Sequence, residues 1–342
     1  MKKVILILVL LTAVTAVLGL PAAIGSFVKN GISSTVDEQL PDARMEWDRG
    51  WFRSSVRIED ENFSARLNFR HVSPEAGWLS INGLVQLSEI PAAVDVDARV
   101  SLGGTLTVNA RAPELDVPGP VTWRYDAPSL SLVAERDGAT RVHGAADGLL
   151  VVDGIGNRLA FSDPRLDVIL TSESMQTSSG TLSLTAKRVG RAESRIGVKI
   201  SSINSSAVTE LVQALRQLAR AEPDSAAARL GAIGAASAWQ QLAAAGLTVE
   251  LEEFVLDGRT GVSGRWVPDD RALTLTGQGE RATVVDWWSN VIGLSEQLRP
   301  EDARSIAQLR LEELEADREI TLDRRQILVD LRTTAEAGAG TD

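Results

Sequence analysis

The stretch Leu182-Ser183-Leu184-Thr185-Ala186 places an apolar side chain at every second position. Successive side chains of a β-strand point to opposite faces of a sheet, so this alternation predicts a strand with one apolar and one polar face. The same period recurs from about residue 44 to residue 203, where Gly, Pro, Asp and Asn separate the segments. Examples are Leu106–Ala110 and Ile196–Ile200, and, with less regular alternation, Leu130–Ala134 and Leu166–Leu170. We therefore expect an α+β, β-dominated protein with a large antiparallel sheet, either curled into a groove or closed as a sandwich.

A late helical insert is predicted at about 205–246, where the alternation stops. Ser205 or Ser206 can cap a first helix that runs to about Ala221. Pro223 lies in the break before a second, Ala-rich helix, which ends near Gly246. Strands are expected again at 247–256, 261–267 and 272–276, followed by a helix over about 300–316 and a strand within 319–331. The tail, 333–342, is expected to be disordered.

The first 28 residues form a separate segment. Lys2 and Lys3 precede an uncharged run, and Val4–Ile24 is long enough to cross a bilayer core as a helix. Basic residues before such a helix favour export of the chain that follows it. We predict a transmembrane anchor at 1–28 and an exported β-rich domain at 29–332. The apolar residues that define the anchor are Val4, Ile5, Leu6, Ile7, Leu8, Leu10, Leu11, Leu18 and Leu20.

An alternative fate of this run is signal-peptide cleavage. Ala23-Ile24-Gly25 resembles a cleavage site, and cleavage there would release the exported chain from the membrane. The stretch Val4–Leu20 is longer than a usual signal-peptide core, which favours the retained anchor. The chain has no cysteine, which excludes lipoprotein processing, disulfides, Cys-ligated zinc and thiol catalysis.

Composition and motifs offer few catalytic candidates. The net charge of −11 argues against nucleic acid as a partner, because phosphates require a basic surface. His71 and His143 are too few for a zinc site, and we interpret both as surface or turn residues. No Gly-x-Ser-x-Gly elbow occurs. Gly154-Ile155-Gly156 begins like a dinucleotide loop, but Leu159 occupies the closing position. The sequence therefore predicts no catalytic residue, cofactor or metal site.

Two pairs of residues leave an alternative open. Asp95 and Asp97 share one face of a predicted strand, where a solvated face is favoured over an acid/base pair or cation site. Trp287 and Trp288 lie in a short predicted helix. They either pack on the sheet or dock at a lipid interface, and the lack of basic residues nearby favours packing.

The block from Arg49 to Ser55, with Gly50, Trp51, Phe52 and Ser54 inside it, is the most specific motif of the chain. Arg49-Gly50 can form a turn between two strands, and Trp51 and Phe52 supply large apolar surfaces. This block, following an N-terminal anchor, resembles the bacterial YdgA-like family of unknown function. The resemblance implies a single-pass inner-membrane protein of Gram-negative bacteria with its bulk in the periplasm. It implies no catalytic residues.

Three functions remain in competition. The first is a non-enzymatic envelope protein that binds lipid or another hydrophobic ligand on the apolar face of its sheet, a comparison with AsmA-like lipid-handling proteins that rests on fold analogy. The second is an envelope protein–protein interaction scaffold with a closed core. The third, an envelope hydrolase, lacks a nucleophile and a metal set. The period of two does not distinguish an open apolar face from a covered one.

Overall fold

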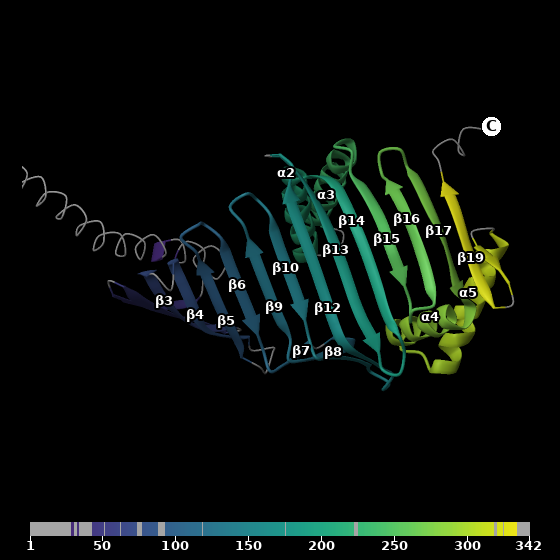
Figure 1. Ribbon diagram of the computed structural model, residues 1–342, viewed down its shortest axis with the longest axis horizontal. Helices are drawn as coiled ribbons and strands as arrows, with labels where there is room; N and C mark the ends of the chain where they lie inside the picture. Colours follow the sequence, from purple (N-terminus) through teal and green to yellow (C-terminus); the bar gives the residue numbers. More distant parts are fainter. Residues whose placement is uncertain are drawn as a thin grey trace, which may run out of the picture. The chain divides into compact units, whose positions relative to one another are not determined.

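The computed structural model describes residues 29–30, 33, 43–50, 52–61, 63–73, 77–87, 93–117, 119–174, 176–221, 225–317, 320–323 and 325–333 (Figure 1). The predicted anchor and most of the predicted tail lie outside these residues. The chain forms two compact units. Unit 1 takes the residues up to Pro118 together with Arg124–Arg136, and unit 2 takes Gly119–Trp123 and the residues from Asp137 onward.

Unit 1 contains an antiparallel sheet in which most neighbouring strands also follow one another in the chain. Its order is β1-β2-β3-β4-β5-β6-β9. In β2 and β5, period-two alternation separates a more buried face from a more exposed one. The strands are β1 (Arg44–Arg49), β2 (Arg53–Asp60), β3 (Phe63–Ser73), β4 (Gly77–Leu87), β5 (Val94–Val100), β6 (Leu106–Arg111) and β9 (Ser129–Ala134). Two short strands lie between β6 and β9, β7 (Glu114–Val117) and β8 (Val121–Asp126).

The core of unit 1 lies on one face of this sheet. Val56 and Ile58 of β2 and Ala65 and Phe69 of β3 are buried there. The ring of Trp47, from β1, stacks on Phe69 with centroids 5.3 Å apart. Because these residues come from adjacent strands in register, the apolar period seen in the sequence becomes one continuous buried patch.

In unit 2 the antiparallel strands β12 to β17 lie side by side in chain order (Figure 1). β19 pairs with β17, and β18 pairs with β19. The strands are β10 (Thr140–Ala145), β11 (Gly148–Asp153), β12 (Arg158–Ser172), β13 (Thr177–Arg188), β14 (Glu193–Asn204), β15 (Thr248–Val255), β16 (Thr260–Val267), β17 (Ala272–Glu280), β18 (Ile320–Leu322) and β19 (Gln326–Thr333).

One long strand of unit 2, β12, pairs with two shorter strands on the same side. The first part of β12 pairs with β11 and the second part with β10, both antiparallel. The register of β12 against β13 shifts between Ser162 and Arg165, at Asp163-Pro164. Asp163 has a φ of 49°, a left-handed conformation that a bulge can require, and the extra residue bends the strand. This irregularity keeps the apolar side chains before and after it on the same face.

The first helical pair of unit 2 is α2 (Ser205–Arg220) and α3 (Ala226–Ala244), which agrees with the predicted insert. The cap of α2 is Asn204 rather than Ser205 or Ser206, because its side chain accepts hydrogen bonds from the backbone N–H groups of Ser206 and Ala207. Gly246 follows α3 with a φ of 83°, as expected after a helix C-terminus. The two helices pack closely at Gly231 of α3, because the absence of a side chain there lets α3 approach the backbone of Leu218 on α2.

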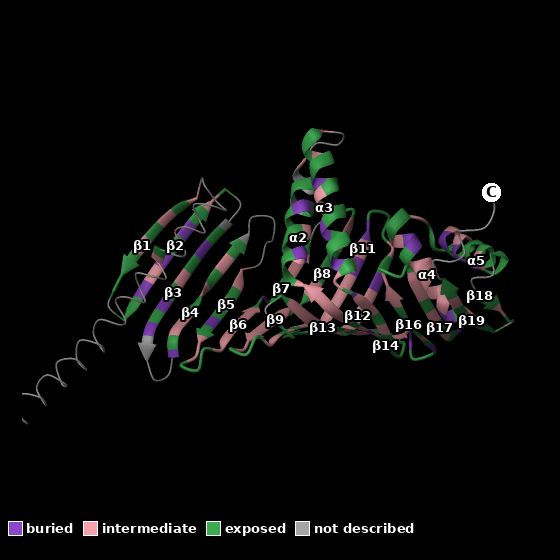
Figure 2. Ribbon diagram, turned by 90° about the horizontal axis from the view of Figure 1, so that it is seen from above, coloured by how far each residue is buried: buried purple, intermediate pink, exposed green. Residues whose placement is uncertain are grey.

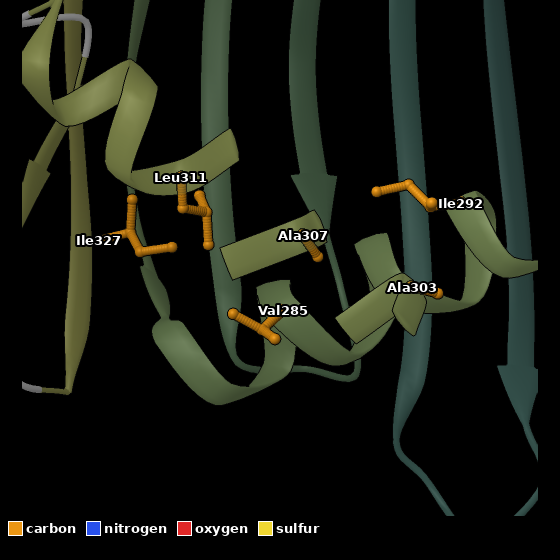
Figure 3. Close-up of a cluster of buried hydrophobic side chains, with 6 residues drawn as sticks. All are labelled: Val285, Ile292, Ala303, Ala307, Leu311 and Ile327. Atoms are coloured by element: carbon orange, nitrogen blue, oxygen red, sulfur yellow. The ribbon is translucent and has the colours of Figure 1, made fainter. Parts of the chain in front are cut away.

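The second helical pair is α4 (Arg281–Glu296) and α5 (Pro300–Ala316), and α5 agrees with the predicted helix. Figure 3 shows the buried residues that join these helices to β19. Ala303 and Ala307 present only methyl groups, so α5 approaches α4 closely, and Leu311 and Ile327 close the cluster. A β-dominated fold with one large antiparallel sheet and late helices is therefore confirmed.

Candidate functional site

Unit 2 carries an extended apolar face on one side of its sheet. The strand register aligns its residues in rows across the strands. One row runs Leu166, Leu184, Ile196, Phe254 and Val262. The next row runs Val142, Val168, Leu182, Val198, Leu251, Gly264, Leu275 and Leu331, which takes it across eight strands. We call this surface the apolar face.

Helices contact the apolar face at two places. Near one end, Ile200 packs against the cluster formed by α2 and α3, and Trp239 of α3 stacks on Trp266 with centroids 5.5 Å apart. Near the other end, Val329 packs against the α4–α5 cluster. Figure 2 shows both helical pairs on the same side of the unit 2 strands. The two helical pairs therefore cover two separate parts of the apolar face.

Between these contacts the face remains open. The side chains of Leu182 and Leu184 on β13 are 36% and 41% exposed, and Leu170 on β12 is 40% exposed. Their strand neighbours Val198 and Ile196 are half-buried. Scattered exposed leucines are ordinary, but adjacent ones aligned by register form a contiguous apolar patch, which makes it a candidate interaction surface.

A buried ionic cluster bounds the apolar face below α4. Arg188, only 8% exposed, lies on the same side of β13 as Leu184. Its guanidinium donates to the carboxylates of Asp257 at 2.8 Å and Asp286 at 2.5 Å. It also lies over the ring of Trp287, at 5.3 Å from the centroid. The free-energy cost of burying this charge is offset by its contacts with two carboxylates and an aromatic ring. The cluster therefore anchors α4 to the sheet.

The two tryptophans of α4 pack inward. Trp287 lies 5.8 Å from the ring of Phe161 on β12, and Trp288 packs against the α4–α5 cluster. Both are partly buried. The structure thus supports packing on the sheet for this pair, as the sequence favours.

The motif around Ser54 forms a second notable site, in unit 1. Gly50 lies in the turn between β1 and β2, as predicted, and its N–H donates to the carbonyl of Arg53. A Cβ at Gly50 would lie 2.5 Å from that carbonyl oxygen, so only glycine fits. Phe52 is 46% exposed and does not supply the buried surface expected of it. Trp51 is outside the described residues, and Arg49 ends β1.

His71 is the motif's long-range partner, which corrects its interpretation as a surface or turn residue. It is 1% exposed on β3, and its Nε2 lies 3.0 Å from Oγ of Ser54. Its Nδ1 has no hydrogen-bond partner among the described residues. Desolvation by burial lowers the pKa of His71, and the positive charge of Arg49 lowers it further. A buried, neutral pair of this kind has no access to substrate and acts as a structural contact.

The remaining sequence candidates show no catalytic arrangement. Asp95 and Asp97 are exposed on β5, in agreement with a solvated face, and His143 is exposed on β10 beside Asp167. The Gly154 loop is a turn before strand β12, where the carboxylate of Asp153 accepts the N–H of Asn157 at 2.8 Å. In the part of the chain that the structure describes, no three His, Asp or Glu side chains are grouped so as to hold a metal ion.

Searches for similar proteins return no match among protein-family models, curated proteins or solved structures. None of the described helices is both long and apolar enough to cross a membrane. The candidate functional site is therefore defined by geometry alone, and it is the apolar face of unit 2. Sequence periodicity predicted its individual strands, whereas the pairing that aligns them into rows appears only in the structure.

Proposed function

We propose that this protein binds the hydrocarbon part of a lipid, or a similar hydrophobic ligand, on the apolar face of unit 2. It acts without catalysis. The observation that carries the proposal is the run of leucines on β12 and β13 that remains exposed while aligned in register with the valines and isoleucines beside it.

The dimensions of the face suit an acyl chain. Eight strands at about 4.8 Å spacing span about 34 Å. An acyl chain reaches across half of a bilayer core, about 15 Å. The central rows can therefore take one or more chains laid across the strands, in contact with side chains that carry no charge. Covering this surface releases water from apolar side chains at about 25 cal/mol for each Å² buried.

The location we propose is the envelope of a Gram-negative bacterium. The apolar run at 1–28 would hold the chain in the inner membrane, with units 1 and 2 in the periplasm. A hydrophobic-ligand protein benefits from such an anchor because it keeps the binding face near the bilayer that supplies the ligand. Retention of the chain in washed inner membranes, starting at Met1 or Lys2, would support the anchor, whereas a soluble product starting near Ser26 would contradict it.

A site-resolved crosslinking experiment tests the ligand. Cells producing the full chain are fed a fatty acid that carries a photoactivatable diazirine, and crosslinked peptides are mapped by mass spectrometry after illumination. We expect crosslinks within β12, β13 and β14 in addition to any at 1–28. Crosslinks confined to 1–28 would show contact with bulk membrane only and would overturn the proposal.

A protein-interaction scaffold is the second candidate function, and the α2–α3 hairpin favours it. Leu215, Leu230 and Ile233 are 48%, 62% and 66% exposed on this hairpin, away from its packing against the sheet. Because the chain has no cysteine, an Ile233→Cys variant carries a unique thiol for crosslinking in intact cells. Capture of one stoichiometric protein would favour the scaffold, and the absence of any specific product would count against it.

A further inference from the structure

Unit 1 carries a row of small polar side chains on the face opposite its core. Strand register aligns Asp48, Ser55, Asn68, Asn82, Asp97, Asn109 and Ser131 across β1, β2, β3, β4, β5, β6 and β9. Each member has a carboxylate, amide or hydroxyl group. We call this the polar row. An ordinary solvent-exposed face only has to be polar, and it usually carries charged residues of both signs. It does not require amide and carboxylate groups on consecutive strands.

The centre of the polar row lies in a hollow. Its volume is about 580 Å³, and its lining includes Asn82, Asp97 and Asn109 from the row. Arg66, Asp95 and Arg111 line it from the neighbouring row. These six side chains combine positive, negative and neutral hydrogen-bonding groups. Leu84 and Val96 also line it, so the hollow combines charged and amide groups with apolar surface.

The polar groups of the hollow are available to a ligand. Arg111 lies directly opposite Asp95 in the strand register, yet among the described residues the two form no ion pair. Within the same part of the chain, the side chains of Asp97 and Asn109 make no hydrogen bond to protein atoms. Such groups bind water in the free protein and can exchange that water for ligand hydroxyls with little rearrangement of the sheet.

We propose that the polar row binds a neutral, linear oligosaccharide laid across the strands. A sugar hydroxyl both donates and accepts, so a ring of hydroxyls can satisfy amide, carboxylate and guanidinium groups together. Adjacent strands are about 4.8 Å apart, close to the length of one sugar ring, so successive rings would meet successive members of the row.

Other ligand classes fit less well. Asp95 and Asp97 would repel a nucleic acid phosphate, and Arg66 and Arg111 would repel a metal cation. A peptide strand adds to the edge of a sheet, whereas the hollow lies on its face.

Titration calorimetry of the full chain, held in a detergent without a sugar headgroup, tests this site. The probes are cellotetraose and the tetramer of N-acetylglucosamine. We expect binding of at least one probe, and loss of affinity by about tenfold or more in the double variant Asn82→Ala/Asn109→Ala. The matched control is Gln86→Ala, an exposed residue on the same face of β4 that does not line the hollow. Its affinity should stay within about twofold of the unmodified protein.

Two outcomes would overturn the assignment. One is the absence of binding of either tetramer by the unmodified chain. The other is binding that the double variant leaves unchanged while circular dichroism shows it folded. If the double variant is unfolded, Asp97→Asn, which keeps shape and removes one charge, replaces it as the test variant. Neither outcome affects the hydrophobic-ligand proposal, because that proposal rests on other residues in unit 2.

Discussion

Oγ of Ser54 lies 3.0 Å from Nε2 of His71, and both side chains are buried although seventeen residues separate them. The contact joins the conspicuous Arg49–Ser54 motif to β3. It gives the motif a structural role, because the serine satisfies a polar ring that would otherwise be buried without a partner.

Removing the serine hydroxyl should destabilise unit 1. We expect Ser54→Ala to lower the free energy of unfolding by about 1–3 kcal/mol, since it leaves buried Nε2 of His71 unsatisfied. Urea denaturation followed by circular dichroism measures the change. Ser55→Ala, on the opposite face of the same strand, should cost less than about 0.5 kcal/mol. Equal effects of the two variants would contradict the assigned role.

The stability of unit 1 should fall in mild acid. Burial lowers the pKa of His71 below its ordinary value of 6.5, so between these two pKa values the unfolded chain binds a proton that the folded chain does not. Stability is therefore fully present above pH 6.5 and decreases as the pH falls toward the folded pKa.

Urea midpoints at several pH values, for the unmodified chain and for His71→Gln, measure the contribution of His71. The pH dependence between 6.5 and the folded pKa should be weaker in His71→Gln. A His143→Gln variant removes the other histidine and separates its contribution from that of His71. An unchanged pH profile in His71→Gln would refute the prediction.

Charges placed on the apolar face should abolish ligand binding with little loss of stability. Leu182→Glu/Leu184→Glu puts two carboxylates where a hydrocarbon chain would lie, and both positions are already partly exposed. We expect at least a tenfold loss of photoactivatable fatty acid incorporation into β12–β14.

Thr181→Glu/Thr185→Glu adds the same charge on the opposite face of β13 and should retain incorporation. Equal loss in the two double variants would mean that net charge, and not the apolar face, determines the result.

The buried ionic cluster should be sensitive to truncation. Arg188→Ala leaves the buried carboxylate of Asp257 without its cation. We expect a loss of about 3–5 kcal/mol in the free energy of unfolding. Arg195→Ala, which removes a solvent-exposed partner of Glu193, should have a much smaller effect because water screens this pair. In the double variant Arg188→Ala/Asp257→Ala the combined loss should be smaller than the sum of the single losses. Additive losses would show that the two residues are not coupled.

Several elements could be predicted from local sequence because local chemistry specifies them. The alternation at Leu182–Ala186 marks β13, and Pro300 marks the start of α5. The prediction of a surface or turn position for His71 is wrong, because His71 continues the alternate positions of Leu67 and Phe69 on the buried face of β3. This alternation is present in the sequence and could have identified His71 as a buried residue.

Other features depend on contacts between distant segments. Arg188 meets Asp257 and Asp286 from 69 and 98 residues away, and no local pattern pairs a particular arginine with a particular carboxylate. The bulge at Asp163 decides which side chains share a face across β12, and its position follows from pairing with β13. The exposure of Leu182 depends on where the helices dock, which periodicity does not encode.

The order of strands from β12 to β17 has an evolutionary consequence. Each strand pairs with the next along the chain, so one hairpin can be inserted or deleted without rethreading the others. Every such event would change the breadth of the leucine-rich surface by about 10 Å and leave the alternation of the remaining strands intact. Selection on such insertions and deletions lengthens or shortens the surface in steps of one hairpin, without remodelling a pocket.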